Sequence, residues 1–239
     1  MYECPVCDRK FSEKTRTGNF NGLRTDPKII AIALTFLTRY KLTYREVGAA
    51  LKELFNIKRS HVCIQKWVRR FGSMFHKHFR QYKVKFGSKW HADAMTVTIR
   101  GKRAYVWVVR DTRGKMVGST VTRKKDRNAA ARFFRNAKRN SHRQPKRLIM
   151  DKCPSMKAAK KTELHRPKVV NGHIFGKVTN NIMEGFFGAN LRPAFDKHRG
   201  FKNIHSVNMY MQIHRATENL RGGSASPIHE KLLFLMGCP

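Results

Sequence analysis

The chain contains 239 residues, and 51 Lys or Arg against 15 Asp or Glu give it a formal net charge of +36. Hydrophobic residues make up 41% of the sequence, which is enough to bury a core and excludes a wholly disordered chain. A folded chain this basic repels itself unless a polyanion neutralises it. Nucleic acid is therefore the first candidate partner, and an anionic membrane surface is the second.

The pattern of apolar residues excludes a membrane partner. The longest apolar run, residues 29–37, is far shorter than the roughly twenty residues that cross a bilayer. The first residues, Met-Tyr-Glu-Cys-Pro, do not resemble a signal peptide. Five cysteines at irregular spacing are not typical of a secreted disulfide framework. We therefore expect a cytoplasmic protein associated with the nucleoid.

Residues 1–21 form a polar segment that contains one Cys-x-x-Cys motif, Cys4 to Cys7. This motif is typical of one knuckle of a zinc ribbon. A closed structural zinc site needs four ligands, and no second Cys-x-x-Cys follows. Cys4 and Cys7 are thus predicted to form half of a Zn²⁺ site, completed by a missing knuckle or by a second chain. The alternative is a tail that binds no metal.

Residues 26–75 are predicted to form three short helices. Pro27 at a first helical position, a capping box at Thr43 and the hydroxyl of Ser60 mark their starts. Gly72 marks the expected end of the third helix. The tight turn before that helix is typical of a helix-turn-helix DNA-binding domain.

The third helix and the turn before it present polar and basic side chains that suit contact with DNA. Gln and Arg bond base edges in the major groove, while Lys and Arg neutralise phosphates. A three-helix packing unit with a basic, solubilising face is the alternative. The predicted DNA-binding residues of this domain are Arg59, Ser60, His61, Gln65, Lys66, Arg69 and Arg70.

After a basic linker at residues 76–88, residues 89–220 have the pattern of an α/β domain. Three strands rich in Val, Thr, Trp and Tyr come first, and a helix, a short apolar strand and further helices follow. Meandering strands followed by crossovers predict a mixed sheet flanked by helices. Residues 221–239 are predicted to be a flexible tail. The strands are expected at residues 89–99, 104–111, 116–122 and 147–150.

Only nine carboxylates follow Lys89, and most have local explanations. Asp111 lies in a predicted turn, and Asp126 is placed to cap a helix. Glu218 is among those expected to lie in polar, solvated surroundings. None of these three needs a functional role.

Three carboxylates lack such an explanation. Asp93 lies inside the first strand, where a carboxylate is costly to desolvate. Asp151 ends the short apolar strand, at the edge where such sheets hold their ligands. Glu184 lies among the apolar residues of a later helix. Converging carboxylates form a hard oxygen site for Mg²⁺ or Mn²⁺, and two ions would activate a scissile phosphate. The alternative is three separate buried ion pairs.

Six blocks in a fixed order carry a resemblance to a known family. They are Trp90-His-Ala-Asp93; Tyr105-Val-Trp-Val-Val-Arg-Asp111; Arg123-Lys-Lys-Asp126 with Ala129-Ala-Ala-Arg-Phe-Phe134; Asp151-Lys-Cys-Pro-Ser155; Asn180-Asn-Ile-Met-Glu184; and Arg199-Gly-Phe-Lys202. The chain resembles the DDE transposases of prokaryotic insertion sequences, specifically insertion-sequence family six. The resemblance implies an RNase H-like catalytic domain in which Asp93, Asp151 and Glu184 bind metal. Its implied chemistry is phosphodiester hydrolysis at the element end, then strand transfer by the 3′-hydroxyl.

The resemblance also implies DNA contacts near the C-terminal end of this domain, at Arg192, Arg199 and Lys202. The family's basic residue two turns after the Glu falls at Leu191 here, and Arg192 follows one position later. One position rotates a helical side chain by about 100°. The expected partners are double-stranded DNA, both as terminal inverted repeats and as target, and a second copy of the chain, because two ends must be held together.

Two other functions are compatible with the same residues. A catalytically decayed descendant of a DDE enzyme would only bind DNA through its helix-turn-helix. An RNase H-like nuclease acting on RNA would use the same metal site. The helix-turn-helix favours duplex DNA as the substrate.

Overall fold

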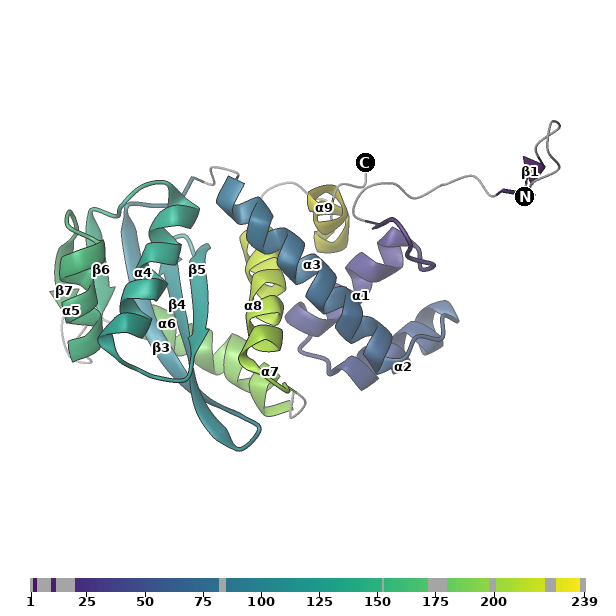
Figure 1. The fold of residues 1–239 in the computed structure, drawn as a ribbon, viewed down its shortest axis with the longest axis horizontal. Helices are drawn as coiled ribbons and strands as arrows, with labels where there is room; N and C mark the ends of the chain where they lie inside the picture. Colours follow the sequence, from purple (N-terminus) through teal and green to yellow (C-terminus); the bar gives the residue numbers. More distant parts are fainter. Residues whose placement is uncertain are drawn as a thin grey trace.

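The computed structural model has a helical unit at one end and a β-sheet covered by helices at the other (Figure 1). The residues that it describes are 2–3, 10–11, 20–81, 85–151, 153–171, 180–197, 201–221 and 227–236. A separate two-stranded sheet near the N-terminus pairs β1 (Tyr2–Glu3) with β2 (Lys10–Phe11).

The predicted helix-turn-helix segment folds into three helices. They are α1 (Pro27–Arg39), α2 (Tyr44–Phe55) and α3 (His61–Gln81). Asp26 caps α1, and Thr43 forms the predicted capping box at α2. Gly48 lies where the turn before α3 crosses α2, because a Cβ atom there would meet the carbonyl oxygen of Arg59 at 2.8 Å. A glycine at this point therefore permits the tight turn.

The sheet has five strands in the order β5-β4-β3-β6-β7. Their bounds are β3 (Lys89–Ile99), β4 (Lys102–Asp111), β5 (Met116–Thr122), β6 (Arg147–Met150) and β7 (Lys168–Asn171). The first three form an antiparallel meander, and β6 and β7 run parallel to β3. This RNase H-like topology confirms the predicted mixed sheet. Strand β7 was not predicted, since its four residues carry no long apolar pattern.

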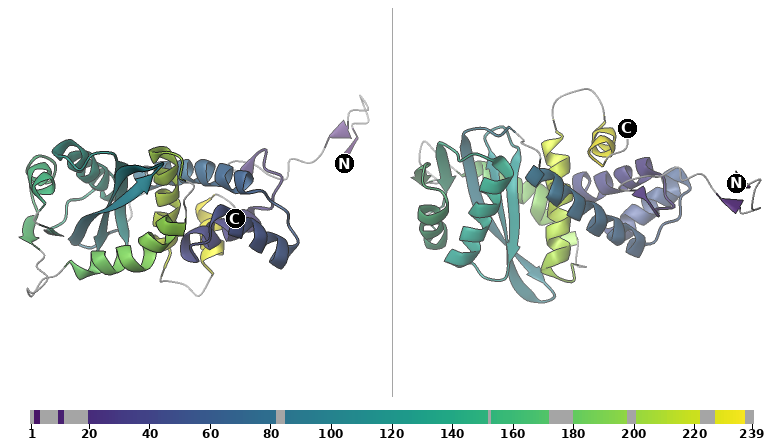
Figure 2. Two further views of the ribbon diagram at one scale, coloured as in Figure 1. Left: turned by 90° about the horizontal axis from the view of Figure 1, so that it is seen from below. Right: turned by 45° about the horizontal axis from the view of Figure 1, so that its top comes forward.

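Helices cover both faces of the sheet, as the left view of Figure 2 shows. The helices are α4 (Arg127–Ser141), α5 (Pro154–Glu163), α6 (Asn181–Phe186), the π-helical turn η2 (Phe187–Leu191), α7 (Arg192–Lys197) and α8 (Ile204–Asn219). Helices α4 and α5 pack on one face around the buried Trp107 and Phe133. On the other face, α6 and α8 contribute to a core that continues into α1, α2 and α3. The helical unit and the sheet therefore share a hydrophobic core.

Helix α3 does not end at Gly72, contrary to the prediction, and residues 76–81 of the expected linker belong to it. Gly72 instead marks the crossing of α3 and α8. A Cβ atom at Gly72 would lie 2.6 Å from the carbonyl oxygen of Met209. Beyond this point the apolar stripe continues through the buried Phe75 and Phe79. The glycine thus permits close helix packing and does not end the helix.

The expected flexible tail, residues 221–239, contains a further helix, α9 (Ile228–Leu235). It packs against α1, and its Leu232 and the following Met236 are fully buried. The apolar residues of this segment find a partner only in the folded chain, which explains why its local sequence did not reveal the helix.

Candidate active site

Asp93 and Asp151 come from neighbouring parallel strands. In the register of β3 and β6, Ala92 pairs with Met150. Asp93 follows Ala92 within β3 and Asp151 follows Met150 directly after β6, so the two carboxylates come after this pair at the same level of the sheet. The strand pairing therefore places together two acids that are 58 positions apart in the sequence, from 93 to 151.

The surroundings of Asp93 are unfavourable to its charge. Burial, together with the negative charges of Asp151 and Glu184, raises the pKa of Asp93 to about 6. A hydrogen bond from the Ala94 N–H to Asp93 Oδ1 (2.6 Å) and the charge of Lys125 oppose this shift. Within the described part of the chain, no Lys or Arg forms an ion pair with Asp93. Asp151 and Glu184 thus both repel the charge of Asp93.

Glu184 lies on the exposed side of α6, and its charge acts on Asp93. Among the described residues, no group of three or more His, Cys, Asp or Glu side chains lies close enough together to hold a metal ion. The expectation that the three carboxyl groups already lie within reach of a shared ion is therefore not met. Their charges interact at Asp93, but their side chains do not form a complete set of metal ligands.

Asn180, directly before α6, connects this helix to the strand carboxylates. It is buried, and its Nδ2 donates to Asp151 Oδ1 at 3.4 Å. Its Oδ1 faces the buried His91 of β3, but in the described structure Asn180 Oδ1 and His91 Nδ1 have no hydrogen-bond partner of normal geometry. Burial lowers the pKa of His91, and the Asn180 amide opposes that shift. Sequence reasoning placed Asn180 in a motif but gave it no role. The available signal in the sequence was an amide directly before the helix that carries the predicted ligand Glu184.

The π-helical turn η2 lies between Glu184 and Arg192. In a regular α-helix, eight residues would rotate Arg192 by about 80° from the direction of Glu184. A π-turn accommodates one extra residue through i→i+5 bonding. The turn therefore compensates for the one-residue displacement noted in the sequence. Arg192 lines a hollow of about 450 Å³ with Thr96 and Thr98 of β3.

Helix α7 continues through Pro193 because another group satisfies the backbone there. Pro193 has no N–H to donate to the carbonyl of Ala189, four residues earlier. The Lys41 ammonium, from the loop after α1, donates to that oxygen instead. The helical unit thus contacts the helix that carries Glu184.

Glu218 is buried, although the sequence indicated solvated surroundings. Its side chain is 1% exposed and forms ion pairs with Arg39 of α1, Arg110 of β4 and Arg221. The Arg110 guanidinium also lies over the Phe186 ring at 4.1 Å. A desolvated carboxylate between elements distant in sequence requires such partners, and no local pattern predicts them.

The predicted DNA-binding residues of the helical unit fall into two groups. His61, Lys66 and Arg69 are exposed on α3, and Gln65 is half-buried. Three others bond within the protein. Arg59 donates to Thr25 Oγ1 (2.6 Å), Arg70 donates to the Asn21 carbonyl (2.8 Å), and Ser60 Oγ accepts from the Cys63 N–H (3.2 Å). The structure therefore gives Arg59, Ser60 and Arg70 bonds that hold the turn and the entry to α1.

Near the C-terminal end of the domain, Lys202 is exposed. Arg199, Cys4 and Cys7 lie outside the described residues. Within the described ranges, every helix is too short or too polar to span a bilayer.

Comparison with known proteins identifies the family. A family model described as a DDE domain, of the IS240 transposase type, matches residues 87–224, more than half of the chain. The chain belongs to this DDE transposase family. The match covers the strands and helices that carry Asp93, Asp151 and Glu184, and it confirms the resemblance to insertion-sequence family six.

Relatives with assigned names agree with this family. The transposases for the insertion sequence-like element IS431mec of Staphylococcus aureus strains Mu50 / ATCC 700699 and N315 are 24% identical over 157 residues, which cover 65% of this chain and 69% of each relative. The transposase for IS257 in transposon Tn4003 of Staphylococcus aureus has the same identity and coverage.

Two solved structures of viral proteins show a partial likeness to this chain. The catalytic core domain of BIV integrase gives a TM-score of 0.42 at 13% identity, over 62% of this chain and 94% of that chain. A simian T-cell lymphotropic virus intasome in complex with PP2A regulatory subunit B56 gamma gives a TM-score of 0.42 at 12% identity, over 64% of this chain and 56% of that chain.

Proposed function

We propose that the chain is an active transposase. It binds the terminal inverted repeats of its insertion sequence and hydrolyses a phosphodiester at the element end. The freed 3′-hydroxyl then attacks a phosphodiester of the target DNA, forming a new P–O bond while the target's own 3′-oxygen leaves. The observation that carries the proposal is the register of β3 and β6, in which Asp93 and Asp151 directly follow the paired Ala92 and Met150, with the charges of Asp151 and Glu184 both acting on Asp93. A DNA-binding surface has no electrostatic reason to gather acids in this way.

The three carboxylates suit divalent metal ions better than they suit the Lys and Arg side chains of the protein. Their oxygens are hard donors, and their mutual repulsion lacks a neutralising ion pair within the described residues. We assign Asp93 and Asp151 as ligands throughout the reaction and Glu184 as the residue that completes the site for two Mg²⁺ or Mn²⁺ ions. When bound, the ions polarise the scissile phosphate and lower the pKa of the attacking hydroxyl or water.

The chain's other residues position these groups. Asn180 donates to Asp151 and so limits the rotation of that carboxylate. Arg192, which the π-turn returns toward the line of Glu184, is assigned a contact with a DNA phosphate beside the cleaved bond. Lys41 holds the helix after Glu184 through the Ala189 carbonyl. Binding of DNA to the helical unit is thereby linked physically to the helix that supplies the third ligand.

Recognition of the terminal repeats is assigned to His61, Gln65, Lys66 and Arg69 of α3. Arg59, Ser60 and Arg70 support that surface through their bonds within the protein. Lys202 and Arg199 are assigned to phosphate contacts, and the active assembly is proposed to be a homodimer located on DNA. The zinc half-site at Cys4 and Cys7 stays a prediction.

The decisive experiment compares Asp93→Asn with Asp126→Asn on a duplex that carries the terminal repeat and its flank. Both changes remove one negative charge. Asp126 caps α4 through the Ala129 N–H (2.8 Å), and Asn is an equally good cap. We expect Asp93→Asn to reduce Mg²⁺-dependent nicking by at least about a thousandfold, because it removes a charged ligand. Asp126→Asn should nick like the wild type, and both variants should bind the duplex normally.

Two outcomes would contradict the proposal. Full nicking by Asp93→Asn would remove this residue from the site. Normal binding without nicking by the wild type, with either Mg²⁺ or Mn²⁺, would favour a DNA-binding protein that has lost catalysis.

A further inference from the structure

A second hollow, of about 700 Å³, lies on the face of the sheet opposite α6. The last turns of α4, the loop that leads into β6 and the end of α5 form it. The loop precedes the four-residue strand β6, whereas Asp151 follows that strand. The hollow and the candidate active site are therefore at opposite ends of β6 and on opposite faces of the sheet.

Five cations and one carboxylate line this hollow, together with His142 and Gln144. The carboxylate, Glu163, is used within the protein, because Arg135 donates to both of its oxygens. The remaining cations are Lys138, Arg139, Arg143 and Arg166. All four are exposed, and in the described part of the chain none of them forms an ion pair. We call these four residues the α4–α5 cation cluster.

The backbone that holds the cluster is fixed by hydrogen bonds. Helix α4 ends at His142, whose φ is +53°. Ser141 Oγ donates to the Arg143 carbonyl at 2.5 Å, and Gln144 Oε1 accepts from the Arg166 N–H at 3.2 Å. These bonds tie the α4 end to the α5 end, so the hollow is a built concave surface.

The helix dipole accounts for only part of this charge. Lys138 and Arg139 lie in the last turn of α4, where cations stabilise a helix. Arg143 and Arg166 follow the ends of α4 and α5, outside the last turn in which the helix dipole acts most strongly. Helix α4 also contains no acid to offset its five Lys and Arg residues. Gathering guanidinium groups without carboxylates raises the energy of the fold unless an anion with many phosphates neutralises them.

We propose that the α4–α5 cation cluster binds the phosphate backbone of a second DNA duplex, distinct from the duplex held at the carboxylates. Guanidinium groups bond phosphate oxygens through two parallel N–H groups, and a concave row of them suits a rounded duplex. The intervening sheet prevents one short stretch of DNA from occupying both places. The inference rests on the proposed function, in which the assembly holds more DNA than the stretch at the carboxylates of one chain.

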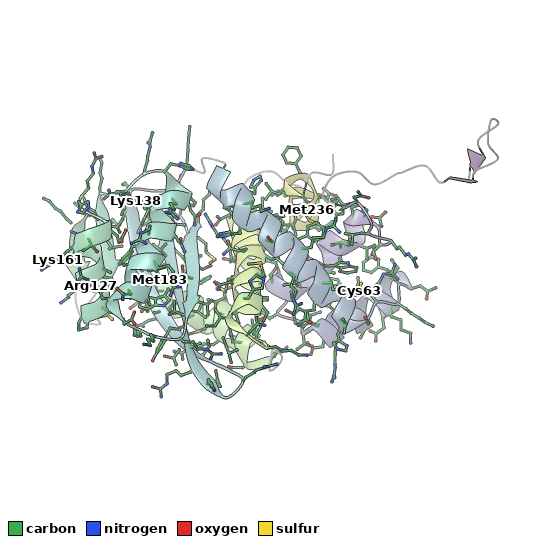
Figure 3. The ribbon with its side chains drawn as sticks, in the orientation of Figure 1. Cys63, Arg127, Lys138, Lys161, Met183 and Met236 are labelled. Atoms are coloured by element: carbon green, nitrogen blue, oxygen red, sulfur yellow. The ribbon has the colours of Figure 1, made fainter. Side chains whose placement is uncertain are left out.

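The test measures binding of a fluorescent duplex that lacks the terminal repeat, with full-length protein already saturated with unlabelled terminal-repeat duplex. The variant Lys138→Ala/Arg139→Ala/Arg143→Ala is compared with Lys157→Ala/Lys161→Ala/Lys168→Ala. The second set removes equal charge from exposed residues of α5 and β7 outside the lining of the hollow. Figure 3 labels one residue of each set, Lys138 on α4 and Lys161 on α5.

We expect the cluster variant to bind the second duplex at least about tenfold more weakly at roughly 0.1 M salt, and the slope of log K against log salt to fall by about 2–3. The control set should change the slope by less than about 1. In the wild type, the bound duplex should protect Lys138 from acetylation more than Lys161. The acetylation measurement uses only the wild-type protein, so it does not depend on whether a variant folds.

Equal losses in both sets would overturn the proposal, since they would indicate a diffuse charge effect. Equal acetylation of Lys138 and Lys161 would do the same, as would displacement of the duplex by poly-glutamate at matched charge. Failure of the proposed function looks different. In that case nicking would be absent. The salt dependence of duplex binding, measured without the terminal-repeat duplex, would still show whether the α4–α5 cation cluster binds DNA.

Discussion

Two carboxylates in this basic chain, Asp93 and Glu218, are both removed from water, but they differ in whether basic side chains compensate for their charge. Glu218 is 1% exposed and forms ion pairs with three arginines. Asp93 is partly buried beside two other acids, and no ion pair neutralises it among the described residues. With 51 Lys and Arg available, a cation could have been placed beside either group.

We propose that this difference separates structural acids from functional ones. The Glu218 cluster satisfies its charges internally and joins α1, β4 and α8. The carboxylates around Asp93 form no ion pairs within the described residues, and in the proposed function an external cation neutralises them. In a chain this rich in Lys and Arg, an acid without a basic partner is a better indicator of a functional site than an acid with one.

The largest effect on stability is expected when the Glu218 cluster is broken. Glu218→Ala leaves Arg39 and Arg110 without their shared partner, so we expect a loss of about 3–5 kcal/mol in the free energy of unfolding. Urea denaturation followed by circular dichroism measures it. Glu230→Ala, which removes an exposed acid on α9, should stay within about 0.5 kcal/mol. Similar values for the two variants would show that the cluster is not cooperative.

Asn180→Ala tests how the site orients a ligand. Loss of its bond to Asp151 should weaken Mn²⁺ binding by about 10–100-fold, with little change in duplex binding. Titration calorimetry on the full chain measures the affinity. Asn181→Ala removes the neighbouring, exposed amide and should leave the affinity unchanged. If both variants bind Mn²⁺ like the wild type, Asn180 does not position Asp151.

Asp93→Asn should stabilise the metal-free protein at neutral and higher pH. The pKa of Asp93 is raised from 3.8 to about 6, so the native state binds the extra proton between these values. Stability therefore falls as the pH rises through this window, and the ionised group costs about 1–3 kcal/mol above it. Urea denaturation with a chelator should show this gain at about pH 8 and none below about pH 4. Lower stability of the variant at about pH 8 would mean that the carboxylate is not repelled.

The smallest effect is expected at the rim of the Glu218 cluster. The Arg221 side chain is 47% exposed, so solvent screens its ion pair, and Arg221→Ala should lower the free energy of unfolding by less than about 1 kcal/mol. Arg39→Ala should have the larger effect, because that side chain is 26% exposed and links α1 to α8. The same urea denaturation measures both. A larger loss at Arg221 would reverse this ranking of buried and exposed pairs.

Much of the fold was predictable because its signals are local. Asp26, Thr43 and Asp126 cap helices through bonds to N–H groups two or three residues away. The content of Val, Thr, Trp and Tyr likewise predicted β3, β4 and β5. The two aspartates of the candidate site were predictable for a related reason, since an acid within or directly after an apolar strand is a local anomaly.

The sequence by itself therefore determined the features that depend on a few neighbouring residues. These are the helix caps, the residue content of the strands, the apolar faces of the helices and the unusual acids in or after apolar strands. The tertiary structure alone decided that Gly72 permits a helix crossing, that Glu218 is buried among arginines, that α9 packs on α1, and that a π-turn realigns Arg192. Each of these depends on a partner more than 100 positions away or on the geometry of a whole helix. Such partners leave no trace in local pattern, because only the folded chain brings their charges and surfaces together.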